Sequence, residues 1–318
     1  MTAPLRGPGF AKLRELADVV YDPWIEQTPL RIYSAEQLAD RIKAESADVV
    51  VVESDSVGGP VFDLGLRAVA STRGDPNNVD IAGATAAGVP VLNTPARNAD
   101  AVAEMTVALL LAVTRHLLPA DSDVRSGNIF RDGSIPYQRF RGREIAGLTA
   151  GLVGLGAVGR ATEWRLSGLG MRVIAHDPYN PDAKHSLDEL LAEADVVSMH
   201  APVTDDTVGM IGAREFAAMR DGAVFLNTAR AQLHDTDALL DALRDGRVAA
   251  AGLDHFVGEW LPTDHPLVGL PNVVLTPHIG GATWDTEARQ AQMVADDLDA
   301  LLRGDAPAHI VNPEVLGP

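Results

Sequence analysis

Apolar residues follow two alternating periods along the chain, one typical of strands and one typical of helices. In the N-terminal part, short apolar runs predict strands at residues 17–21, 47–53, 66–72 and 89–94. Helical spacing between them predicts a helix over 34–45 with Ser34 as its cap, and a short helix over 79–88. Strands that alternate with helices indicate a parallel sheet covered by helices.

The same alternation resumes near residue 148. Apolar runs predict further strands at 151–155, 172–177, 194–202, 222–230, 249–256 and 272–279. The segments 186–193, 212–222 and 235–246 have helical spacing. This half of the chain is therefore predicted to form a second parallel sheet with its own helices.

Two long helices and one irregular segment complete the pattern. Residues 98–119 read as a strongly apolar helix with Asn98 or Asp100 as its cap, and 288–303 as the final helix. Residues 120–148 break the pattern with scattered charges, glycines and a proline. We expect them to run over the surface, where they can reach a partner subunit.

The composition excludes several classes of function. Apolar residues make up 46% and charged residues 22% of the 318 residues, as in a globular protein of two domains. The net charge of −18 without a basic cluster argues against a nucleic-acid partner. The absence of cysteine rules out disulfides, thiolate metal ligands and cysteine nucleophiles. The longest apolar candidate for a membrane span, 107–113, is too short and no signal peptide is visible, so we expect a cytoplasmic protein.

Three glycines, Gly154, Gly156 and Gly159, follow the first apolar run of the second half. A strand-like run enters this spacing and a helical pattern leaves it, which is the context of a dinucleotide site. Gly154 would allow the tight turn, Gly156 the approach of a pyrophosphate, and Gly159 the packing of helix against strand. Asp177 ends the next strand, where its carboxylate would accept hydrogen bonds from ribose hydroxyls.

Polar residues also stand at the ends of the later strands. Arg230, Asp254 and His278 each follow a strand-like run, and Glu259 comes shortly after Asp254. In an open parallel sheet the carboxyl ends of the strands share one edge, where ligands bind. A cation, acids and an imidazole at this edge predict a catalytic site beside the dinucleotide site.

Three segments carry a resemblance to a known family. Residues 226–243 (LNTARAQLHDTDALLDAL), 250–262 (AAGLDHFVGEWLP) and 272–283 (NVVLTPHIGGAT) resemble the signature segments of the D-isomer-specific 2-hydroxyacid dehydrogenases, which include glyoxylate and hydroxypyruvate reductases and phosphoglycerate dehydrogenases. The resemblance runs from about residue 66 to the C-terminus.

The resemblance implies an α/β fold of two doubly wound parallel-sheet domains. A Rossmann-type NAD-binding domain, residues 99–287, would be inserted into a flavodoxin-like substrate-binding domain formed by residues 1–98 and 288–318. It also implies a homodimer formed through the NAD-binding domain.

The resemblance assigns catalytic roles to three residues. Arg230 matches the arginine that holds the substrate carboxylate and polarises the carbonyl, a task that suits a planar guanidinium. His278 matches the general acid/base, and Glu259 matches the carboxylate that orients its ring and favours imidazolium. The alternative for Arg230 is a structural role at the strand end or in an ion pair with Asp235.

The resemblance also implies the cofactor and substrate contacts. The cofactor would be NAD, since Asp177 would repel the 2′-phosphate of NADP. Asp254 would bind the nicotinamide carboxamide, and the backbone N–H groups of Arg73 and Gly74 would join Arg230 in binding the substrate carboxylate. The side chains of Arg73 and Arg97 would either bind a further anionic or hydroxylated end of the substrate or form surface salt bridges. The full set of expected cofactor residues is Gly154, Gly156, Ala157, Val158, Gly159, Asp177, Thr228, Ala229, Asp254 and Gly280.

The chain departs from the family pattern at several places. Ala231 and Gln232 follow Arg230 where the family has Gly-Gly or Gly-x, which would narrow the pocket or alter the backbone. His255 replaces an aliphatic residue, and we expect packing to explain it. Residues 1–10 contain no strand-like run where a family-like domain begins with a central strand, so either the start is truncated or another segment or a partner fills the slot. The histidines other than His278 show no shared ligand spacing, so no metal site is expected.

These features predict an NAD-dependent oxidoreductase that interconverts a small D-2-hydroxy acid and its 2-keto acid. We expect it to work as a reductase of a compound such as glyoxylate, hydroxypyruvate or a phosphorylated relative. The alternative is a non-catalytic NAD(H)-sensing protein on the same fold, which the retention of Arg230, Glu259 and His278 disfavours.

Overall fold

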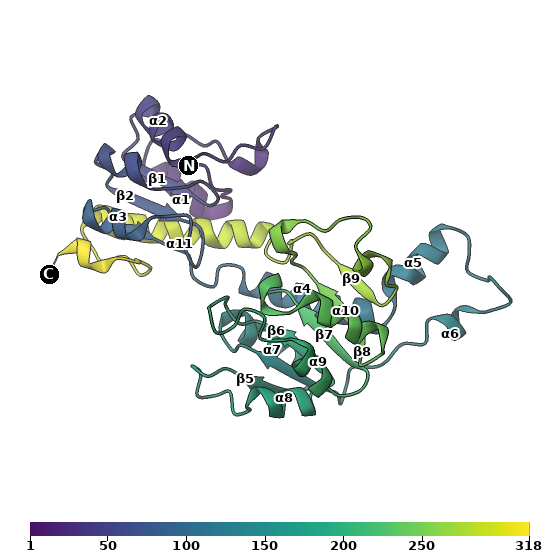
Figure 1. Ribbon diagram of the computed structural model, residues 1–318. Coiled ribbons are helices and arrows are strands. Elements are labelled where there is room, and N and C mark those ends of the chain that lie inside the picture. Colours follow the sequence, from purple (N-terminus) through teal and green to yellow (C-terminus); the bar gives the residue numbers. More distant parts are fainter. Residues whose placement is uncertain (318) are drawn as a thin grey trace. The chain divides into compact units, whose positions relative to one another are not determined.

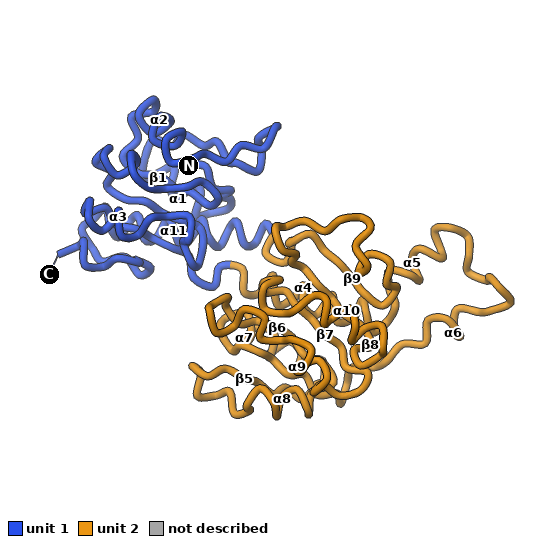
Figure 2. Tube along the Cα trace, viewed as in Figure 1, with its two compact units in different colours: residues 1–97, 283–318 blue, residues 98–282 orange. Residues whose placement is uncertain are grey.

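The computed structural model describes residues 1–317, which divide into two compact units (Figure 2). Unit 1 comprises Met1–Arg97 and Thr283–Pro318, and unit 2 comprises Asn98–Ala282. The second boundary lies at Thr283 and not at the expected residue 288, because helix α11 (Trp284–Arg303) begins earlier than its apolar pattern.

Unit 1 is built around a three-stranded parallel sheet. Strands β1 (Val49–Val52), β2 (Ala68–Ser71) and β3 (Val91–Leu92) pair in the order β1-β2-β3, as the apolar runs predict. Helices α2 (Ala35–Glu45) and α3 (Ile81–Ala86) cover one face, and α1 (Gly7–Leu16) and α11 cover the other. Ser34 caps α2 in a capping box, which confirms the cap predicted from the sequence.

The N-terminus forms a helix that the sequence pattern does not predict. Helix α1 packs along α11, and a Cβ added at Gly9 would lie 2.3 Å from the backbone nitrogen of Gln292. Ion pairs flank this contact, with Arg6 Nε 2.7 Å from Glu287 Oε2 and Lys12 Nζ 2.9 Å from Asp299 Oδ2. Proline in the first turn of α1 and glycine at the closest approach explain how a segment rich in both residues is helical.

The strand predicted over 17–21 is absent from the structure. The segment 1–3 lies beside β1 instead, because the N–H groups of Thr2 and Ala3 donate to Val51 O at 2.9 and 3.3 Å. The prediction was wrong, because residues 17–21 form no regular strand; the segment instead lies beside Met1, whose amino group donates to Val20 O at 2.8 Å and whose carbonyl accepts from Asp22 N–H at 3.0 Å. Tyr21 contacts Phe10 with ring centroids 4.4 Å apart.

Unit 2 contains a six-stranded parallel sheet (Figure 1). Its strands pair in the order β5-β4-β6-β7-β8-β9 and confirm each strand predicted in this half of the chain. The chain runs from β4 outward to β5 and then crosses to β6 on the other side of β4, so ligands are expected at the carboxyl ends of β4 and β6. The strands are β4 (Thr149–Val153), β5 (Arg172–His176), β6 (Val196–Met199), β7 (Ala223–Asn227), β8 (Val248–Leu253) and β9 (Val273–Leu275).

Alternate strand residues of unit 2 enter two separate cores. One core holds Val153 and Phe225 from the strands, under α8 (Leu187–Glu193), α9 (Ala213–Ala218) and α10 (Thr236–Arg244). The other holds Leu152 and Leu226 under α4 (Ala99–Thr114) and α7 (Ala157–Gly168). Helices on both faces of two parallel sheets confirm the α/β fold. Short 3-10 helices lie at Trp24–Glu26, Gly59–Leu64, Ala231–Leu233, Val257–Glu259, Pro266–Gly269 and Pro313–Leu316.

The single helix expected over 98–119 is broken in two. Helix α4 ends at Thr114, and α5 (Leu117–Arg125) follows His116, whose φ of 54° is left-handed. The two helices differ in direction by 64°. The chain then forms an arm, residues 117–143, which includes α6 (Pro136–Arg139) and projects from unit 2 (Figure 1). Within residues 1–317 no single helix meets the length and hydropathy required to cross a membrane, and only the bent pair α4–α5 meets them jointly, by length and composition alone.

We predict that Gly9→Ala lowers the free energy of unfolding by about 1–3 kcal/mol, because the added methyl group meets the backbone of α11 and no flexible side chain. Urea unfolding followed by circular dichroism measures the change. Gly168→Ala in α7 is the matched control, since no heavy atom lies within 4 Å of its added Cβ. The control should unfold at the wild-type urea concentration or above it, and equal stability of Gly9→Ala would contradict the α1–α11 packing.

Candidate active site

The turn between β4 and α7 contains the three glycines of the sequence motif. Gly154 has a φ of 100°, and a Cβ on it would lie 2.6 Å from Ala201 N, so the end of β6 excludes a side chain. A Cβ on Gly159 would lie 2.3 Å from Gly154 O. No heavy atom lies within 4 Å of the Cβ position at Gly156. The fold therefore requires the first and third glycines, whereas the room at Gly156 fits the close approach of a pyrophosphate.

The N-terminus of α7 supplies donors at this turn. Gly156 is its N-cap, and the Gly156 carbonyl accepts a hydrogen bond from Arg160 N–H at 2.9 Å. The N–H groups of Ala157 and Val158 precede this first bond and have no intrahelical acceptor. The first turn carries no acidic side chain, so N–H groups and the helix dipole together favour an anionic phosphate.

Asp177, at the end of β5, is tied to the glycine turn. Its Oδ2 accepts from Leu155 N–H at 2.8 Å and its Oδ1 from Tyr179 N–H at 3.0 Å. Each carboxylate oxygen has a second lone pair, so the side chain retains capacity for ribose hydroxyls. Asp177 therefore stabilises the turn in addition to the role predicted from the sequence.

Asn227, the last residue of β7, organises the turn that carries Arg230. Its Oδ1 accepts from Ala229 N–H at 3.0 Å, and its Nδ2 donates to Arg230 O at 2.8 Å. The neighbouring Thr228 is buried, with its hydroxyl 2.8 Å from that of Thr106 on α4. Sequence reasoning missed Asn227, although its place at the end of a predicted strand was an available signal.

The guanidinium of Arg230 is free to bind an anion. Its side chain is exposed and donates to Ala229 O at 2.6 Å. Asp235 accepts hydrogen bonds from Asp237 N–H and Ala238 N–H at the start of α10. Within residues 1–317 no carboxylate lies within salt-bridge distance of Arg230, so the ion pair with Asp235 considered from the sequence does not form.

Asp254, at the end of β8, is buried and fixes the loop after β9. Its Oδ1 accepts from the Thr276 hydroxyl at 2.5 Å and from Ile279 N–H at 3.0 Å. Its Oδ2 accepts from Gly280 N–H at 2.7 Å, and a Cβ at Gly280 would lie 2.8 Å from that oxygen. The hydrogen bonds thus give Asp254 and Gly280 a structural task beside the cofactor role predicted for them.

The structure brings His278 and Glu259 together. His278 Nδ1 lies 2.9 Å from Glu259 Oε1, and both side chains are about half exposed, at 42% and 57%. Both residues also have left-handed backbones, with φ of 54° and 55°. Such conformations cost free energy in residues other than glycine and occur often at functional sites. The carboxylate can hold the proton on Nδ1 and leave Nε2 for proton exchange.

His255 lies against His278, with ring centroids 3.6 Å apart and an angle of 49° between the rings. The side chain is 4% exposed. Burial above all, together with the nearby His278 and Arg230, lowers the pKa of His255 to about 3, so the imidazole is neutral near pH 7. Packing thus accounts for part of its presence, as expected from the sequence.

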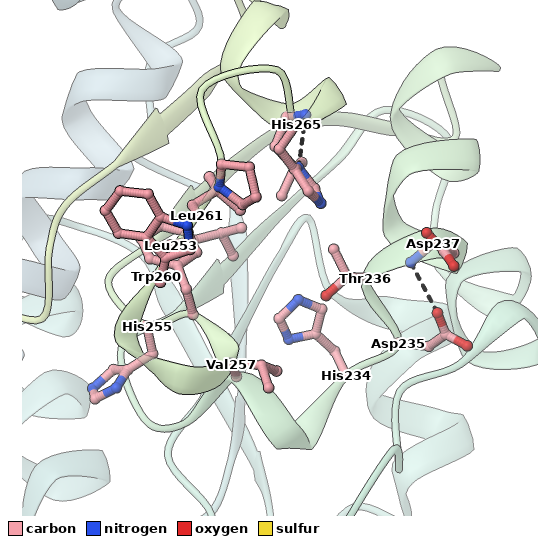
Figure 3. A pocket seen from close by; sticks show the side chains of 14 residues that line it. His234, Asp235, Thr236, Asp237, Leu253, His255, Val257, Trp260, Leu261 and His265 are labelled. Atoms are coloured by element: carbon pink, nitrogen blue, oxygen red, sulfur yellow. Dashed lines mark hydrogen bonds between the residues drawn. The ribbon is translucent and has the colours of Figure 1, made fainter.

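A cavity of about 240 Å³ lies in unit 2 next to His255. Its lining includes Ala231, His234, Leu253 and Trp260. Figure 3 shows the His234 ring among these side chains. Asn227 Nδ2 lies 3.0 Å from His234 Nδ1, which leaves the proton on Nε2, a buried atom without a partner among residues 1–317. Ala231 is buried in a 3-10 helix and its side chain lines the cavity.

The predicted substrate residues of unit 1 lie in their own hydrogen-bond network. Arg73 Nε donates to Glu53 O at 2.6 Å, and its guanidinium donates to Asn77 Oδ1 at 2.5 Å. Arg97 pairs with Glu53 Oε1 at 2.6 Å, and burial lowers the pKa of Arg97. These contacts favour the salt-bridge alternative for Arg97. Gly74 approaches Pro95, with 3.4 Å between its Cβ position and Pro95 Cα.

We predict that acid destabilises unit 2 through His234. Burial lowers the pKa of His234 from 6.5 to about 4, so between these values the unfolded chain binds a proton that the folded chain does not. The free energy of unfolding therefore falls as the pH drops through this window, by about 3 kcal/mol for this group at pH 4. His234→Phe should show a smaller loss of stability than wild type in urea titrations between pH 7 and pH 4. An unchanged pH dependence in this variant would contradict the assignment.

Comparisons with known proteins agree with this geometry. The family model of the D-isomer specific 2-hydroxyacid dehydrogenase NAD binding domain matches residues 107–280, within unit 2. A glyoxylate reductase from Thermofilum pendens is 38% identical over 320 residues, which cover 97% of this chain and 92% of the relative. The TT0316 protein from Thermus thermophilus superposes with a TM-score of 0.83 at 36% identity and 98% coverage of both chains.

A second solved structure carries the cofactor. The NAD-complexed D-isomer specific 2-hydroxyacid dehydrogenase from Lactobacillus delbrueckii has a TM-score of 0.78 and 28% identity, with 96% of both chains covered. The family model, the full-length relative and the glycine turn confirm the NAD cofactor predicted from the sequence. The chain therefore belongs to the D-isomer specific 2-hydroxyacid dehydrogenases and is an NAD-dependent enzyme of that family.

Proposed function

We propose that the protein reduces a small 2-keto acid to its D-2-hydroxy acid, with His278 as the general acid, Glu259 as its partner and Arg230 as the substrate-binding cation. The observation that carries this proposal is the His278–Glu259 contact of 2.9 Å in the unit that also holds the glycine turn and an unpaired Arg230. Glyoxylate is the first substrate to test, since the Thermofilum pendens relative is a glyoxylate reductase.

The chemistry divides between cofactor and protein. NADH supplies the hydride that reduces the keto carbon. The Arg230 guanidinium offers two parallel donors for the carboxylate and carbonyl oxygens of a 2-keto acid. His278 donates a proton from Nε2 to the keto oxygen as charge develops there, while Glu259 accepts the Nδ1–H hydrogen bond and stabilises the imidazolium before transfer. In the direction of oxidation the same nitrogen takes the proton back.

The finer site assignments belong to this proposal. Ala157 and Val158 would bind phosphate through their N–H groups, and Asp177 would bind ribose. Unit 2 would be the NAD-binding domain and unit 1 the substrate-binding domain, with Arg73 and Gly74 N–H groups contacting the carboxylate. The other proposed cofactor contacts, carried over from the sequence, are Gly154, Gly156, Gly159, Thr228, Ala229, Asp254 and Gly280. The cytoplasmic location stays a prediction of the sequence.

We predict that the purified protein oxidises NADH with at least one member of a panel of small 2-keto acids. His278→Asn should lower kcat by about 10²–10⁴-fold while NADH binding stays near wild type, because the variant lacks the acid but asparagine tolerates the left-handed backbone. His116→Asn is the matched control, since His116 also has a φ of 54° and belongs to no proposed site.

Stopped-flow absorbance measures turnover, and NADH fluorescence measures binding. Tight NADH binding without turnover of any keto acid would favour the NAD(H)-sensing alternative. Full activity of His278→Asn would reject the proposed acid.

We also propose that two copies of the chain associate through unit 2. The arm exposes a run of large apolar side chains. An apolar groove of about 390 Å³ also lies between α4 and α7, around Trp164. Trp164 itself is 72% exposed. Exposed apolar side chains that lie together are typical of protein interfaces. In a dimer with two-fold symmetry, the arm of each copy would be buried against the other copy. The exposed apolar residues of the arm are Leu117, Leu118, Val124, Ile129, Phe130, Ile135 and Tyr137.

We predict a dimer mass for the wild-type protein in light scattering coupled to gel filtration. Trp164→Asp should shift the mass toward a monomer, because the carboxylate would be desolvated in the interface. Val208→Ser, which alters an exposed apolar residue outside the arm and groove, is the control. A monomeric wild type, or a dimeric Trp164→Asp, would contradict this interface.

A further inference from the structure

The proposed acid, His278, is one of three metal-ligating side chains that converge in unit 2. His255, Glu259 and His278 each present one ligand atom, and these atoms lie within 4.8 Å of one another. Two imidazoles and a carboxylate are a ligand set that zinc proteins use. The spacing in the sequence gave no sign of this set, because His278 comes from the loop after β9 whereas the other two follow β8.

The two distances from Glu259 to the histidines suit a small tetrahedral ion. Glu259 Oε1 lies 2.9 Å from His278 Nδ1 and 3.9 Å from His255 Nδ1. Two ligands about 2.1 Å from Zn²⁺ at a tetrahedral angle are about 3.4 Å apart. Each of these two pairs would therefore adjust by about half an ångström, which is small beside the freedom of an exposed glutamate side chain.

The ligand atoms are chemically available. His255 Nδ1 lies 3.9 Å from Glu259 Oε1, beyond hydrogen-bond distance, so this nitrogen has no hydrogen bond to Glu259 to lose when it binds an ion. The His255 ring contacts that of His278 with centroids 3.6 Å apart, whereas two imidazoles that share a tetrahedral ion have centroids about 5 Å apart, so the exposed His278 ring must move away from His255 when the ion binds. Glu259 and His278 are about half exposed, so an ion can reach them from solvent. The negative charge of Glu259 offsets the nearby positive charge of Arg230.

We propose that His255, Glu259 and His278 form a binding site for a divalent transition-metal ion such as Zn²⁺, and that the bound ion inhibits the reaction. The second part of this proposal depends on the proposed role of His278. A site with two imidazole nitrogens favours Zn²⁺, Co²⁺ or Cu²⁺ over Mg²⁺ and Ca²⁺, which prefer oxygen ligands.

Metal binding and proton donation exclude one another at His278. The ion takes the lone pair of Nδ1, and the proton of the neutral ring moves to Nε2, so no proton is released. A metal-bound imidazole with its proton on Nε2 cannot accept a second proton and become imidazolium. The ion also engages Glu259, which then no longer stabilises a charged ring.

The experiment uses the full chain after dialysis against a chelator, with Co²⁺ as a visible probe and Zn²⁺ as the competing ion. We expect the absorption bands of tetrahedral Co²⁺ to appear on titration and to disappear when Zn²⁺ is added. Saturating Zn²⁺ should lower NADH oxidation at least tenfold, and the chelator should restore it.

His255→Leu is the deciding variant because it removes one ligand and leaves Glu259 and His278 in place. This variant should bind Co²⁺ at least tenfold more weakly than wild type. Zn²⁺ should lower the rate of NADH oxidation by the variant less than tenfold, relative to the rate of the same variant without metal. His185→Gln is the matched control, because His185 and Glu193 form a second histidine–glutamate pair, 3.6 Å apart, outside the cluster. NADH fluorescence verifies that both variants are folded.

The two proposals fail in different ways. Absence of the Co²⁺ spectrum at millimolar metal, or equal Co²⁺ affinity of wild type and His255→Leu, would overturn the metal site whatever the enzyme turns over. A Co²⁺ spectrum that depends on His255 in a protein that reduces no keto acid would support the metal site and reject the proposed reaction. Inhibition by Zn²⁺ that is equal in His255→Leu would show that the ion acts elsewhere.

Discussion

One buried carboxylate, Asp254, holds the candidate active site in shape. Its hydrogen bonds to Thr276, Ile279 and Gly280 join the end of β8 to the loop after β9. His278 lies inside that loop and is half exposed, so packing alone does not position its ring. Loss of the Asp254 carboxylate would leave two backbone N–H groups without acceptors, at about 1–3 kcal/mol each. The position of the imidazole therefore depends on a residue that need not touch it.

Two left-handed residues and a close backbone contact lie at the same edge of the unit 2 sheet, whereas the left-handed His116 and Asp132 lie in or next to the arm. Gly154 approaches the end of β6, and Glu259 and His278 both have left-handed backbones. Elsewhere in unit 2 the strands enter well-separated cores of ordinary apolar residues. The regular part of the unit thus provides the stability that permits strained residues where ligands are expected.

The regular elements and much of the site could be predicted from the sequence. Strands β4–β9 follow from apolar runs, and Gly154, Asp177, Arg230 and His278 follow from their places at strand ends. Helix α1 could not be predicted, because it depends on a glycine contact with a helix at the other end of the chain. The same holds for His255, which gains its role from a contact with His278 that no local pattern encodes. Asn227 differs, because its place at the end of a predicted strand was an available signal.

The hydrogen bond that Asp177 accepts in the glycine turn has a consequence for changing the cofactor specificity of this enzyme. A carboxylate next to the ribose is the obvious residue to replace when NADP is wanted in place of NAD. Here the same carboxylate accepts the Leu155 N–H inside the glycine turn. A basic replacement would remove a repulsive charge and a structural acceptor together, so such a redesign needs a second substitution that supplies an acceptor for Leu155. An evolutionary change between NAD and NADP preference at this position would likewise affect both the charge near the ribose and the hydrogen bond to Leu155.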